Sequence, residues 1–378
     1  MGNIVVISHK FNTQPDDDLV LYLKGKKEKN VMHITHAFSD SPNRISTCIW
    51  CKDGNSHKVW KSRDYKGSPE IIIYLKEIIF TLKCILRSKV YWEACVCMDG
   101  LCTLYGMLGK MFMRVKKVIY WAIDFVPDSR FKSKAKNFIY KSINTLGYKK
   151  ADEMWDLSPR MVEAREKFLG IKLEDYKKHK VVPYGVWVER IRRYSYEECD
   201  KNTLVFMGHL IEKQGVQLVI KSIPQIVKRN PDFKFKVIGK GRYKDTLKKM
   251  ASDLKIERYV NFMEVEEDIV LEEEIAKSCV AIAPYIKSLD TWTYYADPGK
   301  VKKYLGCGVP VLLTNVPWNA KEIEENKCGR IITEDLNSIV NNVVDLMGCD
   351  INQTLRDNTL RYSKSFDYST IFDSTPIC

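Results

Sequence analysis

The sequence predicts an α/β protein of two Rossmann-like domains, whose parallel sheets face a central cleft. The first reason is length, because 378 residues exceed one ordinary core and fit two domains of about 150–200 residues each. The second reason is that short apolar runs alternate with helix-sized segments along the chain. This alternation is typical of parallel sheets that helices cover on both faces.

The second half of the chain shows the alternation most clearly. Its candidate strands are TLVFMG, KFKVIG, YVNFME, CVAIAP, VPVLLT and GRIIT (203–208, 234–239, 259–264, 279–284, 309–314 and 329–333). The first half offers NIVVIS, NVMHIT, VYWEACVC, KVIYWAID and ADEMWDLS (3–8, 30–35, 90–97, 117–124 and 151–158). Between the candidate strands 90–97 and 117–124, apolar residues at three- and four-residue steps over residues 101–115 predict a helix. This helix either packs on its own sheet or, with its basic flank, touches anionic lipid.

The switch between the two halves is expected near KVVPYGVWVERI, where Pro183 and Gly185 end a strand. We therefore expect an N-terminal Rossmann-like domain over residues 1–185 and a C-terminal one over 186–360. Residues 361–378 are expected to form a tail that returns to the N-terminal domain.

Composition indicates a globular protein of the cytoplasm. Hydrophobic residues make up 45% of the chain and charged residues 29%. Several of the twelve cysteines lie in apolar runs, where a free thiol packs as a small hydrophobic group, so a reducing compartment is the simpler interpretation. The opening MGNIVVIS has no basic leader, and the apolar stretch 71–86 is interrupted by three charges. Neither a signal peptide nor a membrane-spanning helix is therefore expected.

The net charge of +13 belongs entirely to the first half. Residues 1–180 contain 33 Lys and Arg against 20 Asp and Glu, whereas the remainder contains 28 of each. This asymmetry favours an anionic partner, such as a lipid-linked acceptor or the inner face of a membrane, over a basic surface that serves only solubility. Nucleic acid is not expected, because no recognisable module interleaves the basic residues with stacking aromatics.

Two segments of the second half are candidates for binding phosphate. Gly208 ends a strand and precedes a helix, whose N-terminal amides attract anions, and Lys213 adds a cation. Residues 297–300 (Asp-Pro-Gly-Lys) form a turn that opens a short helix, and Lys300 and Lys303 are expected to share one helix face. We expect both segments to converge on one diphosphate. Metal is not expected, since Cys48 and Cys51 lack a second ligand pair.

These segments carry a resemblance to a known family. The series FMGHLIEKQGVQLVIKSI, FKVIGKGRYKDTLKKM, VNFMEVEED, VAIAPY and DPGKVKKYLGCGVPVLLTNVP resembles the donor domain of the retaining GT-B glycosyltransferases of family four. The resemblance implies a UDP- or GDP-sugar donor without a further cofactor. It implies donor contacts from Gly208, His209, Lys213, Gly239, Val265, Tyr285, Asp297, Pro298, Gly299, Lys300 and Lys303. The family's paired glutamates fall at Tyr295 and Lys303, so this chain departs from the pattern there.

The first half resembles the family's acceptor domain less closely. Asp124 follows the strand that often carries a reaction-centre acid or histidine, and Asp99 ends the preceding strand. Both are candidate catalytic residues, although each could instead cap the turn or helix that follows it. Arg130 is a candidate contact for a phosphate-bearing acceptor.

The sequence therefore predicts a retaining glycosyltransferase that acts in cell-surface polysaccharide biosynthesis. It would transfer sugar to a glycan or lipid-linked acceptor, in the cytoplasm or at the inner membrane face. A non-catalytic GT-B-like binding subunit and a nucleotide-sugar epimerase on the same fold are the alternatives, and Lys303 in place of an acid motivates the first of them.

Overall fold

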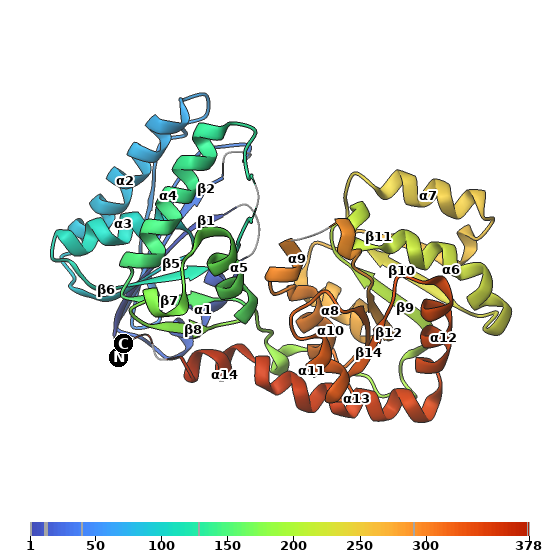
Figure 1. The fold of residues 1–378 in the computed structure, drawn as a ribbon. Helices are drawn as coiled ribbons and strands as arrows, with labels where there is room; N and C mark the ends of the chain where they lie inside the picture. Colours follow the sequence, from blue (N-terminus) through green and yellow to red (C-terminus); the bar gives the residue numbers. More distant parts are fainter. Residues whose placement is uncertain are drawn as a thin grey trace. The chain divides into compact units, whose positions relative to one another are not determined.

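The computed structural model describes residues 2–10, 14–38, 41–127, 129–289, 292–375 and 377 (Figure 1). The chain forms two compact units. Unit 1 comprises Met1–Pro183 and Ile371–Cys378, and unit 2 comprises Tyr184–Thr370. The division lies close to the expected boundary at residue 185, but the segment that returns to unit 1 begins at Ile371 rather than at residue 361.

Unit 1 is built on an eight-stranded sheet with the order β4-β3-β2-β1-β5-β6-β7-β8. Its strands are β1 (Asn3–Lys10), β2 (Asn30–Ala37), β3 (Thr47–Lys52), β4 (Asn55–Lys61), β5 (Trp92–Cys97), β6 (Val115–Ala122), β7 (Glu153–Asp156) and β8 (His179–Val181). All neighbouring pairs are parallel except those of the β3–β4 hairpin, which is antiparallel to β2. Its helices are α1 (Pro15–Gly25), α2 (Glu70–Arg87), α3 (Gly100–Met111), α4 (Lys134–Lys150) and α5 (Pro159–Leu169), and α14 (Tyr368–Asp373) enters it from unit 2.

The helix predicted over residues 101–115 is shorter than expected. Helix α3 ends at Met111, and Val115 already belongs to β6. Between them Met113 adopts a left-handed backbone conformation with φ of 52°, which cannot continue a right-handed helix. The apolar spacing therefore runs through a turn into the next strand.

Unit 2 contains a six-stranded sheet with the order β11-β10-β9-β12-β13-β14, and all of its pairs are parallel. Its strands are β9 (Asp200–Met207), β10 (Lys234–Ile238), β11 (Val260–Met263), β12 (Ser278–Ala283), β13 (Val311–Thr314) and β14 (Gly329–Ile332). Its helices are α6 (Val216–Arg229), α7 (Lys244–Asp253), α8 (Asp268–Ala276), α9 (Trp292–Tyr295), α10 (Gly299–Gly306), α11 (Ala320–Glu325), α12 (Leu336–Leu346) and α13 (Cys349–Ser363). The α/β class with two parallel-rich sheets is confirmed.

Burial explains why these segments fold in this way. In α6 the residues that pack on the sheet recur at three- and four-residue steps and are almost fully buried: Val216, Val219, Ile220, Ile223 and Ile226. They meet the central strand β9, where Leu204 and Phe206 are also buried. This core fixes the carboxyl end of β9, at which the first predicted phosphate-binding segment begins.

The described cysteines are free thiols, and all of them except Cys349 are buried. Cys48 and Cys51 lie in β3, and the sulfur of Cys51 is 3.9 Å from the hydroxyl of Ser56. Among the described helices, none has both the length and the hydrophobicity needed to cross a lipid bilayer.

Candidate active site

The carboxyl end of β9 lies against helix α10. Gly208 has φ of +142° and donates its amide hydrogen to the carbonyl of Ile238 (2.9 Å). A Cβ atom at position 208 would lie 2.8 Å from Nζ of Lys300. A side chain at position 208 would therefore displace the Lys300 ammonium from this strand end, and its positive φ also favours glycine.

Gly239 allows the loop after β10 to pack closely against the loop after β9. It directly follows β10 with φ of +148°, and a Cβ atom there would lie 2.0 Å from the carbonyl oxygen of Gly208. The residue thus allows the backbones that follow β9 and β10 to approach each other closely. Of the other residues expected near the donor, His209 is exposed and Val265 is half-buried beyond β11.

The ammonium of Lys300 lies among a neutral amide and two aromatic rings. It donates a hydrogen bond to Oε1 of Gln214 and lies 4.2 Å from the ring centroid of Phe206 and 5.0 Å from that of Tyr285. Among the described residues, no carboxylate forms an ion pair with it. Burial, together with the positive charge of Lys213, lowers the pKa of Lys300 to about 7.

Lys213 lies close to the same place. It belongs to the short 3-10 helix η3 (Glu212–Gln214), and its carbonyl accepts a hydrogen bond from the amide of Ile286 (3.0 Å). Its Nζ is 5.7 Å from the ring of Trp292. Because its charge acts on the pKa of Lys300, two cations meet at this edge of the sheet.

Helix α10 is fixed to the strands by Tyr304. The Tyr304 hydroxyl accepts a hydrogen bond from the amide of Met207 (2.7 Å), the last residue of β9. The N-cap of α10 is Pro298, which supplies no side-chain hydrogen bond to the helix. An uncapped helix N-terminus attracts anions. The two segments singled out in the sequence therefore lie side by side.

The carboxylate of Asp297 is occupied within the protein. It is 3.0 Å from Nζ of Lys302, and both side chains are about 1% exposed. It also accepts hydrogen bonds from the indole of Trp318 (2.8 Å) and the amide of Tyr184 (2.8 Å). Any contact from this turn to a ligand would come from backbone rather than from the Asp297 side chain.

Lys303 differs from the expectation that it reinforces the site of Lys300. Its Nζ lies 3.1 Å from carboxylate oxygens of both Asp268 and Glu272 on α8. Glu272 is 4% exposed and also contacts Arg190 (2.7 Å). Because acids neutralise Lys303 from the neighbouring helix, its charge serves the α8–α10 contact. The position at which the family carries glutamate is here part of an ion pair.

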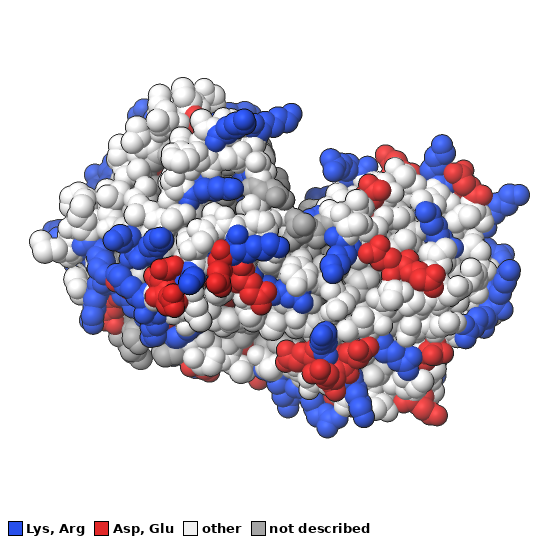
Figure 2. All heavy atoms as spheres, viewed as in Figure 1, with Lys and Arg blue, Asp and Glu red and all other residues white. Residues whose placement is uncertain are grey.

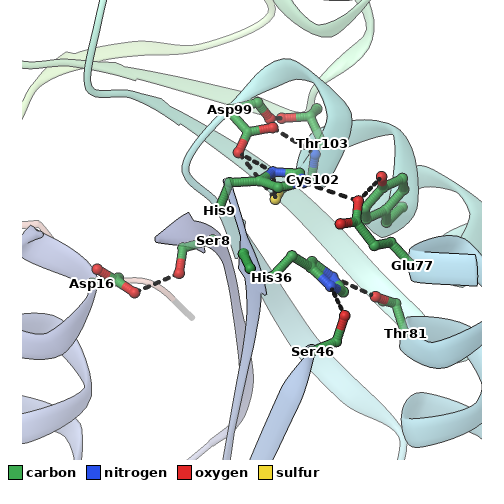
Figure 3. Close-up of polar contacts among 12 residues, drawn as sticks. Ser8, His9, Asp16, His36, Ser46, Glu77, Thr81, Asp99, Cys102 and Thr103 are labelled. Carbon is green, nitrogen blue, oxygen red and sulfur yellow. Dashed lines mark hydrogen bonds and ion pairs between the residues drawn. The ribbon is translucent and has the colours of Figure 1, made fainter. Parts of the chain in front are cut away.

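In unit 1, Asp99 caps α3 and contacts a histidine at the end of β1 (Figure 3). Oδ2 of Asp99 is 2.8 Å from Nδ1 of His9, whose Nε2 is 3.1 Å from Oε2 of Glu77. The thiol of Cys102 lies 3.3 Å from Nδ1 of His9. Glu77 is in turn held by the hydroxyl of Tyr105 (3.1 Å).

The charges of this cluster support one another. Burial alone lowers the pKa of His9, but the charge of Asp99 and the hydrogen bonds outweigh burial and raise it well above 6.5. The same contacts keep the pKa of Asp99 well below its usual range, against the effect of its own burial. An imidazolium therefore lies between two carboxylates, and Asp99, whose side chain is 33% exposed, brings this cluster to the surface.

The nearby His36 is expected to make stability depend on pH. Its ring bonds the hydroxyls of Ser46 (2.8 Å) and Thr81 (3.0 Å), and burial and the charge of His9 lower its pKa to about 4. The unfolded chain takes up this proton near pH 6.5 and the folded chain does not, so acidification destabilises the fold. We expect a loss of about 2 kcal/mol between pH 6.5 and pH 5. Urea unfolding at both pH values measures it.

A matched variant isolates this effect. In His36→Gln the loss between pH 6.5 and pH 5 should shrink, whereas an equal loss in both proteins would contradict the assignment to His36. His9 changes stability only slightly in this window and in the opposite direction, because it is already protonated in the folded chain and becomes fully protonated in the unfolded chain just below pH 6.5.

Asp124 and Arg130 pair with each other beyond β6. Oδ2 of Asp124 is 3.2 Å from Nη1 of Arg130, which also donates to the hydroxyl of Tyr140 (3.2 Å). The charge of Asp99 contributes to the raised pKa of Arg130. The two candidate acids and the candidate phosphate contact thus belong to one electrostatic group at the carboxyl ends of β5 and β6.

Unit 1 also has a cavity and two groups of possible metal ligands. The cavity, about 540 Å³ in volume, lies at the carboxyl ends of β1 and β2 and is lined by Lys10, Thr35, His36, Ala37, Ser41, Pro42, Asn43 and Ile45.

Two groups of side chains in unit 1 could hold a metal ion. His9, Asp99 and Cys102 form one group whose ligand atoms lie within 4.8 Å, and Asp16, Asp17 and His33 form another. In both groups these atoms bond to protein partners.

Sequence reasoning missed several residues that complete these groups. Gln214 directly follows Lys213, and His9 ends the first strand, so both lie in segments where ligand-binding residues are expected. Glu77 could have been singled out for a different reason, because an acid at a buried position of an apolar helix usually has a polar partner. Phe206 and Tyr304 gave no signal beyond that of ordinary core residues.

Comparison with known proteins agrees with this geometry. Residues 201–348 match the family described as "Glycosyl transferases group 1". An uncharacterized glycosyltransferase of Haemophilus influenzae is 23% identical over 70% of this chain and 69% of its own length. A GDP-mannose-dependent phosphatidylinositol monomannoside mannosyltransferase of Mycolicibacterium smegmatis is 24% identical, with 41% of each protein aligned.

The fold of the whole chain also has solved counterparts. The crystal structure of Anabaena HepE in complex with UDP and glucose superimposes with a TM-score of 0.71 and 14% identity, and covers 99% of this chain and 98% of HepE. At this identity the similarity establishes the fold alone. Residues 201–348 thus match the group 1 glycosyltransferase family, and the chain as a whole has the GT-B fold found in such enzymes.

Proposed function

We propose that this enzyme transfers a sugar from a UDP- or GDP-sugar, held by unit 2, to a glycan or lipid-linked acceptor held by unit 1, with retention of anomeric configuration. Retention follows from the family resemblance. The donor diphosphate would contact the Lys300 ammonium, the Lys213 side chain and the N-terminal amides of α10. No metal or further cofactor is needed in this proposal.

The environment of Lys300 carries the proposal. Its ammonium is partly desolvated, is close to a second cation, and has no carboxylate partner among the described residues. A buried cation in this state is costly until an anion binds. When the sugar–phosphate bond breaks, negative charge grows on the leaving diphosphate, and Lys300 and the helix amides would stabilise it.

Three features favour the proposed acceptor, and two of them belong to unit 1. The excess of basic residues in this half favours an anionic acceptor, and Arg130 lies beside the candidate acid Asp124. The polar cavity beyond β1 and β2 offers hydroxyl, amide and ammonium groups, which suit a sugar. The mycolicibacterial relative is named for a phosphatidylinositol-linked substrate. These features favour a role in polysaccharide assembly at the inner face of the membrane.

Donor binding provides the first test. We expect either UDP- or GDP-sugars to raise the melting temperature, because a ligand that binds only the folded state stabilises it. Incubation of the preferred donor with lipid-linked saccharides should then yield a product whose anomeric configuration, read by NMR, equals that of the donor. A chain that binds neither donor class would refute the proposal.

Donor affinity is expected to fall as pH rises above 7. Lys300 has a pKa of about 7 without ligand, and the diphosphate binds its protonated form. The dissociation constant of a UDP-sugar should therefore rise by up to about tenfold per pH unit above pH 7, whereas the diphosphate diester itself does not titrate there. Calorimetry from pH 6 to pH 9 measures this dependence.

The Lys300→Arg variant is the control, because guanidinium stays charged throughout this range. Its dissociation constant should change little with pH. A steep dependence that persists in Lys300→Arg would assign the titration to another group.

A further inference from the structure

Three neighbouring helices of unit 1 leave apolar side chains uncovered. Helix α3 packs against both α2 and α4, and all three expose large apolar residues on their outer sides. We call these residues the apolar face: Ile71, Ile72, Leu75, Ile79 and Leu86 of α2, Met111, Phe112 and Met113 at the end of α3, and Phe138, Ile139 and Leu146 of α4.

The apolar face is not the scatter of exposed residues that any surface shows. Of the 23 exposed large apolar side chains among the described residues, twelve lie between residues 71 and 146, which is about a fifth of the chain. In α2, Ile72, Leu75, Ile79 and Leu86 recur at helical spacing on the side that faces away from the core. A contiguous patch of this kind marks an interaction surface.

The turn after α3 is the most exposed part of the face. Met111, Phe112 and Met113 are 67%, 49% and 81% exposed, and they follow one another directly. Met113 has φ of 52°, a conformation that glycine or asparagine adopts at lower cost. Three large apolar side chains thus lie at a solvent-exposed turn, where a small or polar residue would suit the backbone and the solvent better.

Basic residues border the apolar face. Between residues 83 and 150 the sequence has fourteen Lys and Arg but four Asp and Glu. Lys83 and Arg87 end α2, and Arg114 and Lys116 follow the exposed turn. Within the described part of the chain, none of these four forms an ion pair with a carboxylate. Figure 2 shows a mostly uncharged surface over α2, α3 and α4, with Lys and Arg at its margins.

We propose that unit 1 docks on an anionic lipid bilayer through the apolar face, with Met111, Phe112 and Met113 inserted among the lipids and the bordering Lys and Arg on the headgroups. An anionic bilayer has an apolar interior directly beneath a negatively charged surface, so it can contact both the apolar face and the Lys and Arg that border it. An uncharged protein partner would leave the basic border without counter-charge. The inference rests on the proposed function only in so far as a lipid-linked acceptor is presented at such a surface.

Vesicle flotation with the full-length protein tests the docking surface. We expect the protein to float with vesicles of phosphatidylcholine and phosphatidylglycerol (7:3) and not with phosphatidylcholine alone. Substitution of Met111→Ser, Phe112→Ser and Met113→Asn together should weaken binding roughly tenfold or more, because insertion is lost. About 1 M NaCl should also weaken it, since the Debye length falls to about 3 Å.

Ile269→Ser is the matched control, because Ile269 is 76% exposed but lies on α8 of unit 2, and it should bind vesicles as the wild type does. Wild-type binding by the triple variant would overturn the proposal, and so would a wild-type protein that ignores anionic vesicles. A dimer that the triple variant abolishes, without vesicle binding, would assign the face to a second copy. UDP-sugar binding without vesicles, measured in parallel, reports on the proposed function separately.

Discussion

Replacing Lys300 with methionine is expected to lower kcat/KM for sugar transfer by roughly 100- to 1,000-fold, the range seen when one preorganised charge is removed from a developing anion. Methionine keeps an unbranched side chain of similar length and removes the ammonium, which lies 4.2 Å from the ring centroid of Phe206. Because charge on the diphosphate grows as the bond to the sugar breaks, kcat should fall as well as donor affinity. Initial rates over a range of donor concentrations separate the two.

The fold should survive this substitution. Lys300 has no carboxylate partner among the described residues, so its loss leaves no acid unpaired, and the melting temperature should stay or rise. Lys248→Met, at an exposed position on α7, controls for a general loss of positive charge. Unchanged kinetics in Lys300→Met would remove the proposed diphosphate site, and a similar loss in Lys248→Met would show that the effect is not local.

The sheets were predictable where strands are buried on both faces. Strands β9, β12 and β13 of unit 2 contain continuous apolar runs, because a parallel strand covered by helices on both sides has no polar face. The β3–β4 hairpin escaped prediction because β4 reads NSHKVWK and is almost wholly exposed. Strand β8 has only three residues, and the sequence indicated it through the residues that end it, Pro183 and Gly185, rather than through periodicity.

The site was predictable as far as its backbone, but not in its side-chain partners. Glycine at a strand end and the turn before α10 are local signals, and they located Gly208 and Lys300. The sequence could not show which lysine of α10 stays available, because Lys300 and Lys303 have partners that are distant along the chain, whereas Lys302 pairs with nearby Asp297. Lys300 meets Gln214, and Lys303 meets Glu272, which are 86 and 31 residues away. Tertiary packing alone decides which lysine remains available to an anion.

The cluster around His9 illustrates the same limit. Asp99 was singled out with two open interpretations, and the structure shows it as the N-cap of α3 and as a partner of His9. A helix cap and a surface acid with a lowered pKa are compatible, since the amide and the imidazolium both favour the carboxylate. A catalytic role for Asp99 and Asp124 therefore remains part of the proposal.

Asp297→Asn is expected to cost about 3–5 kcal/mol of folding stability, because it leaves the ammonium of Lys302 buried without its counter-charge. Both side chains are about 1% exposed, and the carboxylate also holds Trp318 and the amide of Tyr184. Urea unfolding of the variant and wild type measures the difference. Donor affinity at low temperature, where the variant stays folded, should change far less than in Lys300→Met, since the Asp297 side chain points into the protein.

A double-mutant cycle identifies the source of this cost. If the unpaired Lys302 is responsible, Lys302→Met combined with Asp297→Asn should recover part of the lost stability, so that the two effects are not additive. Additive losses would place the cost in the hydrogen bonds to Trp318 and Tyr184 instead. A variant of wild-type stability with strongly weakened donor binding would mean that the Asp297 carboxylate contacts the donor, and that the structural role assigned to it is wrong. The distinction matters because the same turn starts α10, and in the proposed function the amides of α10 reach the diphosphate only while the Asp297–Lys302 pair holds that turn in place.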